Sequence, residues 1–565
     1  MVKYTQGEED AAVRLGSIFN MGRPVDNSKV LLDVESLAMH TFIVGSTGSG
    51  KSNTVYHILD ELTSTRRDTL SFMVIEPAKG EYKRVWGHKK SVSVYGTNPE
   101  YMDLLRINPF KFTEHIHVLE HIDRLIEIFN VCWPMYAAMP AVLKDAVIGA
   151  YEACGWDMTT SKNMVSNKLF PSFQDLQEQL VEVIDSSGYS EEVKSNYKGS
   201  LLTRIKSLTN GLNGMIFSSN EIDNKLLFDT NVIIDLSRIG SQETKALIMG
   251  ILVMRLSEYR MDTCVESNSK LKHITVLEEA HNILRNTSVA SSSEEGSSVA
   301  SKSVEMLSNA IAEMRTYGEG FIIADQSPSA VDISAIRNTN TKIIMRLPEE
   351  ADRRLSGKAA ALNDNQLDEI AKLPKGVAVV YQNDWVEPVL CQIDKFNGEE
   401  KEYKFSVKKQ NEESKIANSL LINFIAHNLL DNPDDIIPTD VELAIEKSEC
   451  SVRIKSKLYS MLAEYRRSRK IAIWEEKMFM EQSELIRDVL RLENAVGYSR
   501  RASTDLVGFN CLLNTLVAQR LNKPSDDLIL SLSHGLIKAY SNVEEKNVEF
   551  YKEWHDELTE RGRLL

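Results

Sequence analysis

The sequence lacks any long apolar segment. No uninterrupted run of about 18 apolar residues occurs in it, which is the length that a membrane-spanning helix needs. The first residues, MVKYTQGEEDAAVRLGS, also lack the apolar stretch of a secretory signal. These two absences predict a cytoplasmic protein with no membrane partner.

Cysteine and positive charge are both in short supply. The six cysteines are scattered, with no CxxC pair and no histidine at zinc-binding spacing, so we expect free thiols rather than a zinc site or a disulfide framework. Lysine and arginine number 66 against 81 aspartate and glutamate residues, which gives a net charge of -15. This balance excludes a general nucleic-acid coat protein, because such a protein needs a basic surface. A basic channel inside an acidic exterior remains compatible with it.

The sequence does contain many short apolar runs that alternate with helical stripes. TFIVG, HITVLEE and GFIIADQ are examples of these runs, and several of them end in polar residues. Such alternation predicts an α/β fold with a mainly parallel sheet and helical crossovers. We expect three regions: a short N-terminal lead (1–40), an α/β core (41–395) with a helical insert (about 110–225) and a Ser-rich loop (about 287–303), and an α-helical C-terminal region (400–565).

A glycine-rich loop between an apolar strand and a helix is the strongest motif. It matches G-x-x-x-x-G-K-[ST] and consists of Gly45, Ser46, Thr47, Gly48, Ser49, Gly50, Lys51 and Ser52, with Asn53 following directly. Backbone N–H groups of such a loop surround phosphates, and the helix N-terminus adds a favourable field. In this setting Lys51 reaches the β- and γ-phosphate oxygens, and Ser52 ligates magnesium. We therefore predict that ATP and Mg²⁺ bind at this loop.

Two adjacent carboxylates end a later strand. HITVLEEAH delivers Glu278 and Glu279 at the carboxyl end of a buried strand, where ligands bind in parallel sheets. We predict that Glu278 holds magnesium through its water shell and that Glu279 takes a proton from the attacking water. The alternative is a solvated acidic strand end without a catalytic role.

Two further polar residues flank another apolar strand. Gln326 follows GFIIAD directly and would sense the γ-phosphate or orient water if its strand neighbours the P-loop strand; a plain strand-end amide is the alternative. Arg315 precedes the same strand, and in a hexamer it could reach a neighbour's nucleotide as a finger. A surface salt bridge explains Arg315 equally well, and four other arginines compete for the role of finger: Arg337, Arg346, Arg353 and Arg354.

A family resemblance emerges from these motifs taken together. GSTGSGKSN, VIEPAKGEY, LRINPF, FPSFQDL, NVIIDLSRI, LEEAH, RTYGEGFIIADQSPS and LPKGVAVV resemble the HerA family, relatives of FtsK-type DNA pumps, over roughly residues 12–395. The resemblance implies a RecA-like core, a homo-hexameric ring that hydrolyses ATP between its subunits, and helicase-type translocation along double-stranded DNA. It implies the same roles for the P-loop residues and the two glutamates. It also implies that Gln326 is a phosphate sensor and that Arg315 is an arginine finger acting in trans.

The sequence departs from the family pattern in places. HerA proteins commonly carry an N-terminal β-barrel, and the residues before the P-loop are too few to build one. Met39 and His40 stand where relatives tend to carry an arginine beside the histidine. Glu76 stands where relatives usually carry aspartate, so it either helps to orient the site or is a simple turn acid.

The resemblance also implies a partner, because HerA-like motors commonly work with an effector enzyme. The effector would be a nuclease or a sirtuin-like NAD-consuming subunit, in antiviral defence or in DNA-end processing. The long helical C-terminal region favours the defence setting. Two alternatives stay open: an ATP-dependent scaffold that assembles and regulates an effector without pumping DNA, and a secretion or conjugation ATPase with the same core.

Overall fold

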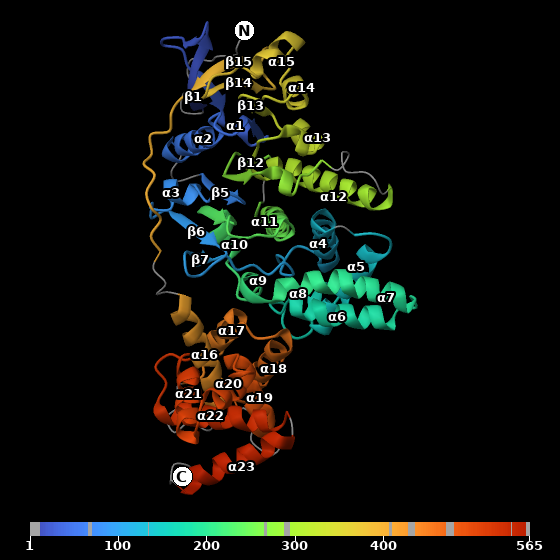
Figure 1. Ribbon diagram of the computed structural model, residues 1–565, viewed down its shortest axis with the longest axis vertical. Coiled ribbons are helices and arrows are strands. Elements are labelled where there is room, and N and C mark those ends of the chain that lie inside the picture. The colour runs from blue at the N-terminus through green and yellow to red at the C-terminus, as the bar shows by residue number, and fades with distance from the viewer. Residues whose placement is uncertain are drawn as a thin grey trace. The chain divides into compact units, whose positions relative to one another are not determined.

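The chain folds into two compact units. The computed structural model in Figure 1 describes residues 12–65, 70–133, 135–264, 268–286, 294–405, 410–427, 435–469, 479–543 and 545–560. Unit 1 consists of Met1–Leu105, Phe112–Asp145 and Ile222–Phe405, and unit 2 consists of Arg106–Lys111, Ala146–Glu221 and Ser406–Leu565. Each unit is therefore assembled from segments that lie far apart in the sequence.

A 13-stranded sheet organises unit 1. Its strands, in spatial order, are β2 (Arg23–Pro24), β1 (Ala12–Asn20), β15 (Val389–Ile393), β14 (Val377–Gln382), β13 (Thr341–Ile344), β4 (Thr41–Val44), β12 (Glu319–Asp325), β11 (His273–Glu278), β5 (Ser71–Glu76), β10 (Asn231–Asp235), β6 (Val92–Gly96) and β7 (Asp103–Leu104), with β3 (Val30–Asp33) paired to β1. Neighbouring strands run parallel from β13 to β7, and the remaining pairs are antiparallel. The mainly parallel α/β sheet that the sequence predicts is confirmed.

The central strands are buried along their whole length. Every residue of β4, β11, β12 and β13 is buried, as expected for parallel strands that are covered on both faces and therefore appear in sequence as continuous apolar runs. The helices of unit 1 are α1 (Val34–Leu37), α2 (Lys51–Thr65), α3 (Tyr82–Trp86), α4 (Val118–Cys132), α10 (Asn224–Phe228), α11 (Gln242–Thr263), α12 (Glu294–Glu313), α13 (Ile333–Arg337), α14 (Glu350–Ala359) and α15 (Asp364–Ile370), and α5 (Met139–Ala153) spans the boundary between the units.

Strand order brings three strand ends together. β12 lies between β4, which leads into the P-loop, and β11, which ends at Glu278. The register pairs Asp325 with Val44 on one side and Ala324 with Glu278 on the other. Because all three strands run in the same direction, their carboxyl ends lie at one edge of the sheet. The condition attached to the Gln326 prediction, that its strand neighbours the P-loop strand, is thus met.

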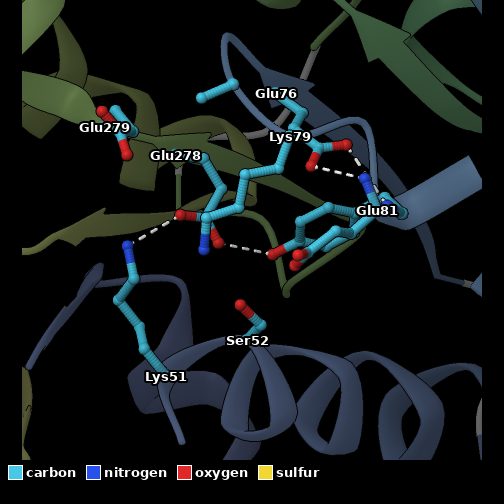
Figure 2. A pocket seen from close by; sticks show the side chains of 9 residues that line it. Lys51, Ser52, Glu76, Lys79, Glu81, Glu278 and Glu279 are labelled. Carbon is cyan, nitrogen blue, oxygen red and sulfur yellow. Dashed lines mark hydrogen bonds and ion pairs between the residues drawn. The ribbon is translucent and has the colours of Figure 1, made fainter. Parts of the chain in front are cut away.

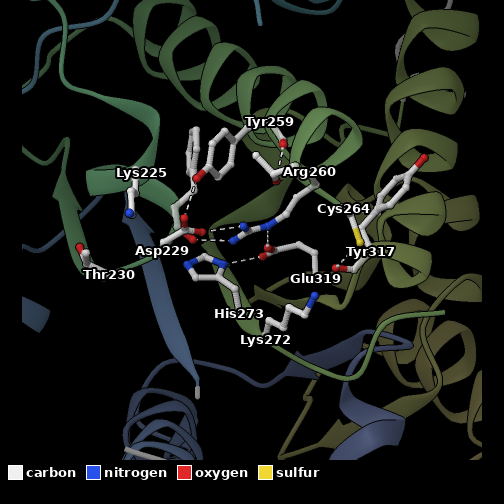
Figure 3. Close-up of polar contacts among 12 residues, drawn as sticks. Lys225, Asp229, Thr230, Tyr259, Arg260, Cys264, Lys272, His273, Tyr317 and Glu319 are labelled. Carbon is white, nitrogen blue, oxygen red and sulfur yellow. Dashed lines mark hydrogen bonds and ion pairs between the residues drawn. The ribbon is translucent and has the colours of Figure 1, made fainter. Parts of the chain in front are cut away.

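A buried polar network fixes the opposite ends of β11 and β12 (Figure 3). Glu319 is fully buried; its carboxylate accepts hydrogen bonds from Arg260 Nε at 2.9 Å, His273 Nδ1 at 2.7 Å and Thr275 Oγ1 at 2.8 Å. Burial alone would raise the pKa of Glu319, but the charges and hydrogen bonds of His273 and Arg260 outweigh burial and lower it. Arg260 also donates to Asp229 Oδ1 at 2.8 Å. This network attaches the first residues of both strands to the end of α11.

The predicted Ser-rich loop is partly helical. Residues 287–293 lie outside the described residues, but helix α12 begins at Glu294 and therefore includes the second half of the predicted loop, down to residue 303. Val304, Leu307 and Ile311 form a buried stripe at helical spacing, and Ser303 is also buried and donates a hydrogen bond to Glu127 on α4. The polar composition predicted a loop, because a sequence does not show whether a serine is exposed to solvent or packed against a neighbouring helix.

Unit 2 is helical. It contains α6 (Phe173–Ser186), α7 (Glu191–Tyr197), α8 (Thr203–Thr209), α9 (Gly211–Ile216), α16 (Gln410–Ala426), α17 (Pro438–Lys447), α18 (Val452–Ser468), α19 (Phe479–Leu490), α20 (Ala495–Ala502), α21 (Leu506–Ala518), α22 (Asp526–Ser541) and α23 (Glu545–Glu560), with a short hairpin of β8 (Trp156–Asp157) and β9 (Lys162–Asn163). The predicted α-helical C-terminal region is confirmed. Lys168 of the insert pairs with Glu446, and Ser219 donates to the carbonyl of Ser448, so both segments belong to one unit.

Within the described part of the chain, no helix combines the length and the apolar character needed to cross a bilayer.

Candidate active site

The P-loop has the backbone conformation that its glycines allow. Gly48 and Gly50 have φ angles of +78° and +113°, a region that residues with a side chain rarely adopt. A Cβ atom on Gly50 would lie 3.0 Å from Met345 Cε and 3.4 Å from the Gly376 backbone. Glycine at these positions therefore lets the backbone N–H groups of the loop surround phosphates. The N-terminus of α2 adds further N–H groups that point at the same site.

Lys51 and Glu278 form a buried ion pair across the pocket (Figure 2). Lys51 Nζ lies 2.9 Å from Glu278 Oε2, and each side chain is 9% exposed. Ser52 lines the same pocket. A hydroxyl and a carboxylate are the oxygen ligands that Mg²⁺ prefers, so this donor set fits the predicted metal. The structure brings together the residues predicted to bind phosphate and magnesium.

Glu279 is connected to the P-loop through Gln326. Gln326 Nε2 donates to Glu279 Oε1 at 2.8 Å, and Thr47 Oγ1 donates to Gln326 Oε1 at 2.7 Å. Glu279 also adopts a left-handed backbone conformation, with φ 50° and ψ 51°. Such strain in a residue other than glycine is uncommon and concentrates at functional sites. The predicted base and the predicted sensor are therefore in direct contact, and both are held next to the loop.

A histidine-aspartate pair lies behind Glu279. His281 Nδ1 donates to Asp325 Oδ2 at 2.9 Å, and His281 Nε2 lies 4.0 Å from Glu279 Oε2. The hydrogen bond to Asp325 raises the pKa of His281. Burial alone would raise the pKa of Asp325, but the bond and charge of His281 outweigh it and lower that pKa. The sequence analysis did not predict that His281 lies beside Glu279, although its position in LEEAH, directly after the two glutamates and an alanine, could have indicated it.

The loop after β5 contributes a further wall of the pocket. Glu76, the last residue of β5, accepts hydrogen bonds from the backbone N–H groups of Glu81 at 2.8 Å and Tyr82 at 3.2 Å. Burial raises the pKa of Glu76 to about 8. The hydroxyl of Tyr82 in turn donates a hydrogen bond to Glu278 Oε1 at 2.7 Å, and burial next to this carboxylate raises the pKa of Tyr82 well above its usual range. Glu76 therefore contacts the backbone at the start of α3. The contact of Tyr82 with Glu278 was not predicted from the sequence.

Lys79 is a second lysine of the pocket that the sequence did not single out. It lines the pocket together with Lys51 and the two glutamates. Figure 2 shows its side chain extending from the loop after β5 across the pocket toward Glu278. Its backbone is left-handed, with φ 68°, and Gly80 after it has φ +66°. The turn thus directs a cationic side chain into the site.

Asn53 and His40 have structural contacts. The Asn53 amide donates to the carbonyl of Asp394 at 3.1 Å and accepts from the N–H of Phe396 at 3.0 Å, so it holds the chain that follows β15. His40 is buried, and burial lowers its pKa to about 4. Its Nδ1 accepts a hydrogen bond from the N–H of Phe321 at 3.1 Å, which ties β12 to the start of the P-loop strand.

Arg315 lies away from this pocket. It belongs to the short 3-10 helix Met314–Tyr317, is exposed, and precedes the amino end of β12, whereas Gln326 follows the carboxyl end. At a rise of about 3.3 Å per residue, the first and last of the seven residues of β12 lie about 20 Å apart. Among the competing arginines, Arg346 lies next to the P-loop, where its carbonyl accepts from Ser46 N at 3.0 Å. Arg315 therefore cannot reach the nucleotide pocket of its own chain.

Comparison with known proteins agrees with this geometry. Residues 18–256 match the family model "Helicase HerA, central domain". The chain is 24% identical over 402 residues to a protein from Sulfolobus acidocaldarius described as "DNA double-strand break repair helicase HerA", covering 70% of this chain and 73% of the relative. It is 24% identical over 403 residues to the protein of the same description from Saccharolobus solfataricus, covering 69% and 70%.

A solved structure supports the fold assignment. VirB4 of Thermoanaerobacter pseudethanolicus superposes with a TM-score of 0.51 at 16% identity, covering 70% of this chain and 98% of that one. The similarity extends beyond the family match, because it takes in most of the chain. With a P-loop, two strand-end glutamates and a mainly parallel sheet in place, the resemblance drawn from the sequence is confirmed as a similarity: the chain has a P-loop ATPase fold, and its residues 18–256 are similar to the central domain of helicase HerA.

Proposed function

We propose that this protein is an ATP-hydrolysing, homo-hexameric motor that translocates double-stranded DNA. The observation that carries the proposal is the convergence of Lys51, Glu278, Glu279 and Gln326 at the carboxyl ends of three adjacent strands. The relatives described as DNA repair helicases support DNA as the substrate of the motor. The ATPase cofactors would be ATP and Mg²⁺.

The first step would be an exchange of partners at Lys51. Its ammonium group pairs with Glu278 in the structure, and triphosphate oxygens entering the loop would compete for the same group. Glu278 and Ser52 would then be available to hold magnesium, which neutralises phosphate charge and orients the terminal phosphoryl group when bound. The buried carboxylate thus keeps a cationic partner before and after nucleotide binding.

The second step would be the release of Glu279. Its carboxylate is occupied by Gln326, which is itself fixed by Thr47 of the P-loop. A γ-phosphate beside Thr47 would disturb this chain of hydrogen bonds, and Glu279 would turn toward the attacking water and accept its proton. Gln326 would then orient the water or contact the phosphate.

Arg315 would complete the site of a neighbouring subunit. Its exposure and its place before the amino end of β12, about 20 Å from the strand end that carries the pocket, support a contact with the nucleotide of a neighbouring subunit. A guanidinium group supplied this way stabilises the negative charge that spreads over the phosphoryl group in the transition state.

A subunit-mixing experiment tests the trans assignment. Arg315→Ala alone should lower kcat for ATP by at least about tenfold, because an arginine finger contributes strongly to phosphoryl transfer. Mixing these chains with Lys51→Ala chains should restore turnover above that of either variant alone, since an intact Lys51 site can then face an intact Arg315. Arg23→Ala is the matched control, because Arg23 is exposed in the edge strand β2 and is not a candidate for the finger. A mixture no more active than its components would contradict action in trans.

DNA dependence tests the motor itself. ATP turnover by the wild-type protein should rise several-fold with double-stranded DNA, and streptavidin should be displaced from biotinylated duplex ends only when ATP is hydrolysed. Turnover that ignores DNA but changes with a partner protein would favour the scaffold alternative instead.

We also propose that an effector subunit, a nuclease or a sirtuin-like NAD-consuming enzyme in antiviral defence or DNA-end processing, associates with the ring. The resemblance to HerA-type motors supports this part of the proposal. Co-expression with each effector class encoded beside the gene, followed by co-purification, tests it directly.

A further inference from the structure

The two oxygens of the Glu278 carboxylate have different partners in the active-site pocket. Oε2 pairs with Lys51 Nζ at 2.9 Å, and Oε1 accepts a hydrogen bond from the hydroxyl of Tyr82 at 2.7 Å (Figure 2). The lysine partner is exchangeable, because phosphate oxygens bind the same ammonium group. Phosphate does not compete for the tyrosine partner in the same way, because the phenol hydroxyl carries no positive charge.

Burial, a ring contact and a backbone hydrogen bond restrict the position of Tyr82. Its side chain is almost completely buried, at 2% exposure. Its ring packs edge-on against Tyr56 of α2, with ring centroids 4.8 Å apart and an interplanar angle of 84°. Its backbone N–H donates to Glu76, the last residue of β5, and β5 pairs directly with β11, the strand that ends in Glu278. A two-torsion side chain so constrained can fix the orientation of the carboxylate it contacts.

We propose that Tyr82 is a positioning residue, which holds Glu278 Oε1 so that Oε2 faces the magnesium site once Lys51 moves to the phosphates. The inference rests on the proposed ATPase function and deepens it. Without the hydroxyl, Glu278 would lose its remaining fixed contact at the moment its lysine partner leaves, and its carboxylate would be free to rotate away from the metal. The hydroxyl of Tyr82 contacts Glu278, and the proposed effect on the metal site acts through this contact.

Tyr82→Phe tests this assignment, because it removes only the hydroxyl and keeps the ring packing. A hydrogen bond to a charged group contributes enough that we expect the Mg²⁺ concentration for half-maximal turnover to rise about tenfold. The affinity for an ATP analogue without Mg²⁺ should stay within about twofold of wild type, because Lys51 and the P-loop are unchanged. A merely structural role would not separate these two measurements.

Tyr56→Phe is the matched control. Tyr56 belongs to the same buried aromatic pair, but among the described residues no hydrogen bond links its hydroxyl to Glu278. Its Mg²⁺ dependence should follow wild type. An equal loss in both variants would overturn the proposal, because it would assign the effect to the aromatic cluster rather than to the contact with Glu278.

A double variant separates positioning from misfolding. The readout is the gain in affinity for the ATP analogue that Mg²⁺ produces, which remains measurable in inactive proteins. In a Glu278→Gln background this gain is already reduced, and Tyr82→Phe should reduce it no further. An additional loss in that background, or a Tyr82→Phe protein with wild-type Mg²⁺ dependence, overturns the proposal. Failure of the wild-type protein to hydrolyse ATP at any Mg²⁺ concentration would instead contradict the proposed function.

Discussion

Exchanging Lys51 for alanine should abolish measurable ATP turnover and weaken nucleotide binding by at least about a hundredfold, because removing one partner of a buried charged contact costs about 2–5 kcal/mol. The side chain is 9% exposed and lies at the start of α2, directly after the glycines of the P-loop. Nucleotide affinity measured by titration calorimetry, together with phosphate release, checks both effects.

The same substitution should also lower the thermal stability of the nucleotide-free protein. Glu278 would remain buried without its cation, a situation that destabilises a fold unless the carboxylate takes up a proton. Lys90→Ala is the matched control, since Lys90 is exposed and lies outside the pocket. Intact hydrolysis in the Lys51→Ala protein would refute the assignment of the P-loop and the mechanism built on it.

Glu279→Gln should differ from Lys51→Ala in nucleotide binding: binding should be retained while ATP turnover is lost. An amide cannot accept the proton of the attacking water, and general-base catalysis contributes about 10²–10⁴-fold, so kcat should fall at least about a hundredfold. The introduced amide oxygen can still accept the hydrogen bond from Gln326 Nε2, so the ligand-free site should stay intact. Single-turnover hydrolysis and analogue binding separate the two effects.

The Glu279 control is a surface glutamate. Glu100 is exposed, and Glu100→Gln removes the same charge without touching the pocket, so its kcat should equal that of the wild type. If Glu279→Gln lowered affinity and left kcat unchanged, Glu279 would be a binding residue, and the proton acceptor would have to be sought elsewhere, first at His281.

The sequence was sufficient for those features that local pattern encodes. The apolar runs ending in Val44, Glu278 and Asp325 are buried strands, and the P-loop follows the first of them as predicted. Gln326 was recognisable only under a condition, because adjacency of β12 and β4 is a property of the sheet and not of either segment.

Long-range contacts were beyond the sequence for a physical reason. Tyr82 meets Glu278 across 196 positions of the chain, and no periodicity or motif marks such a hydrogen bond. The grouping of residues 146–221 with 406–565 in unit 2 is likewise set by packing between distant helices. Composition misled the prediction at α12, where Ser303 is buried instead of solvated.

The ion pair between Lys51 and Glu278 has a consequence for the anions that can bind at the P-loop. The ammonium group of Lys51 is paired with the buried carboxylate of Glu278, so an anion that binds at the P-loop has to compete with this carboxylate. Inorganic phosphate or sulfate can bind Lys51 but leaves Glu278 buried without a cation. A triphosphate bound to a metal ion provides an anion for Lys51 and a cation for Glu278. We therefore expect phosphate and sulfate to bind at this site more weakly than a triphosphate with its metal ion.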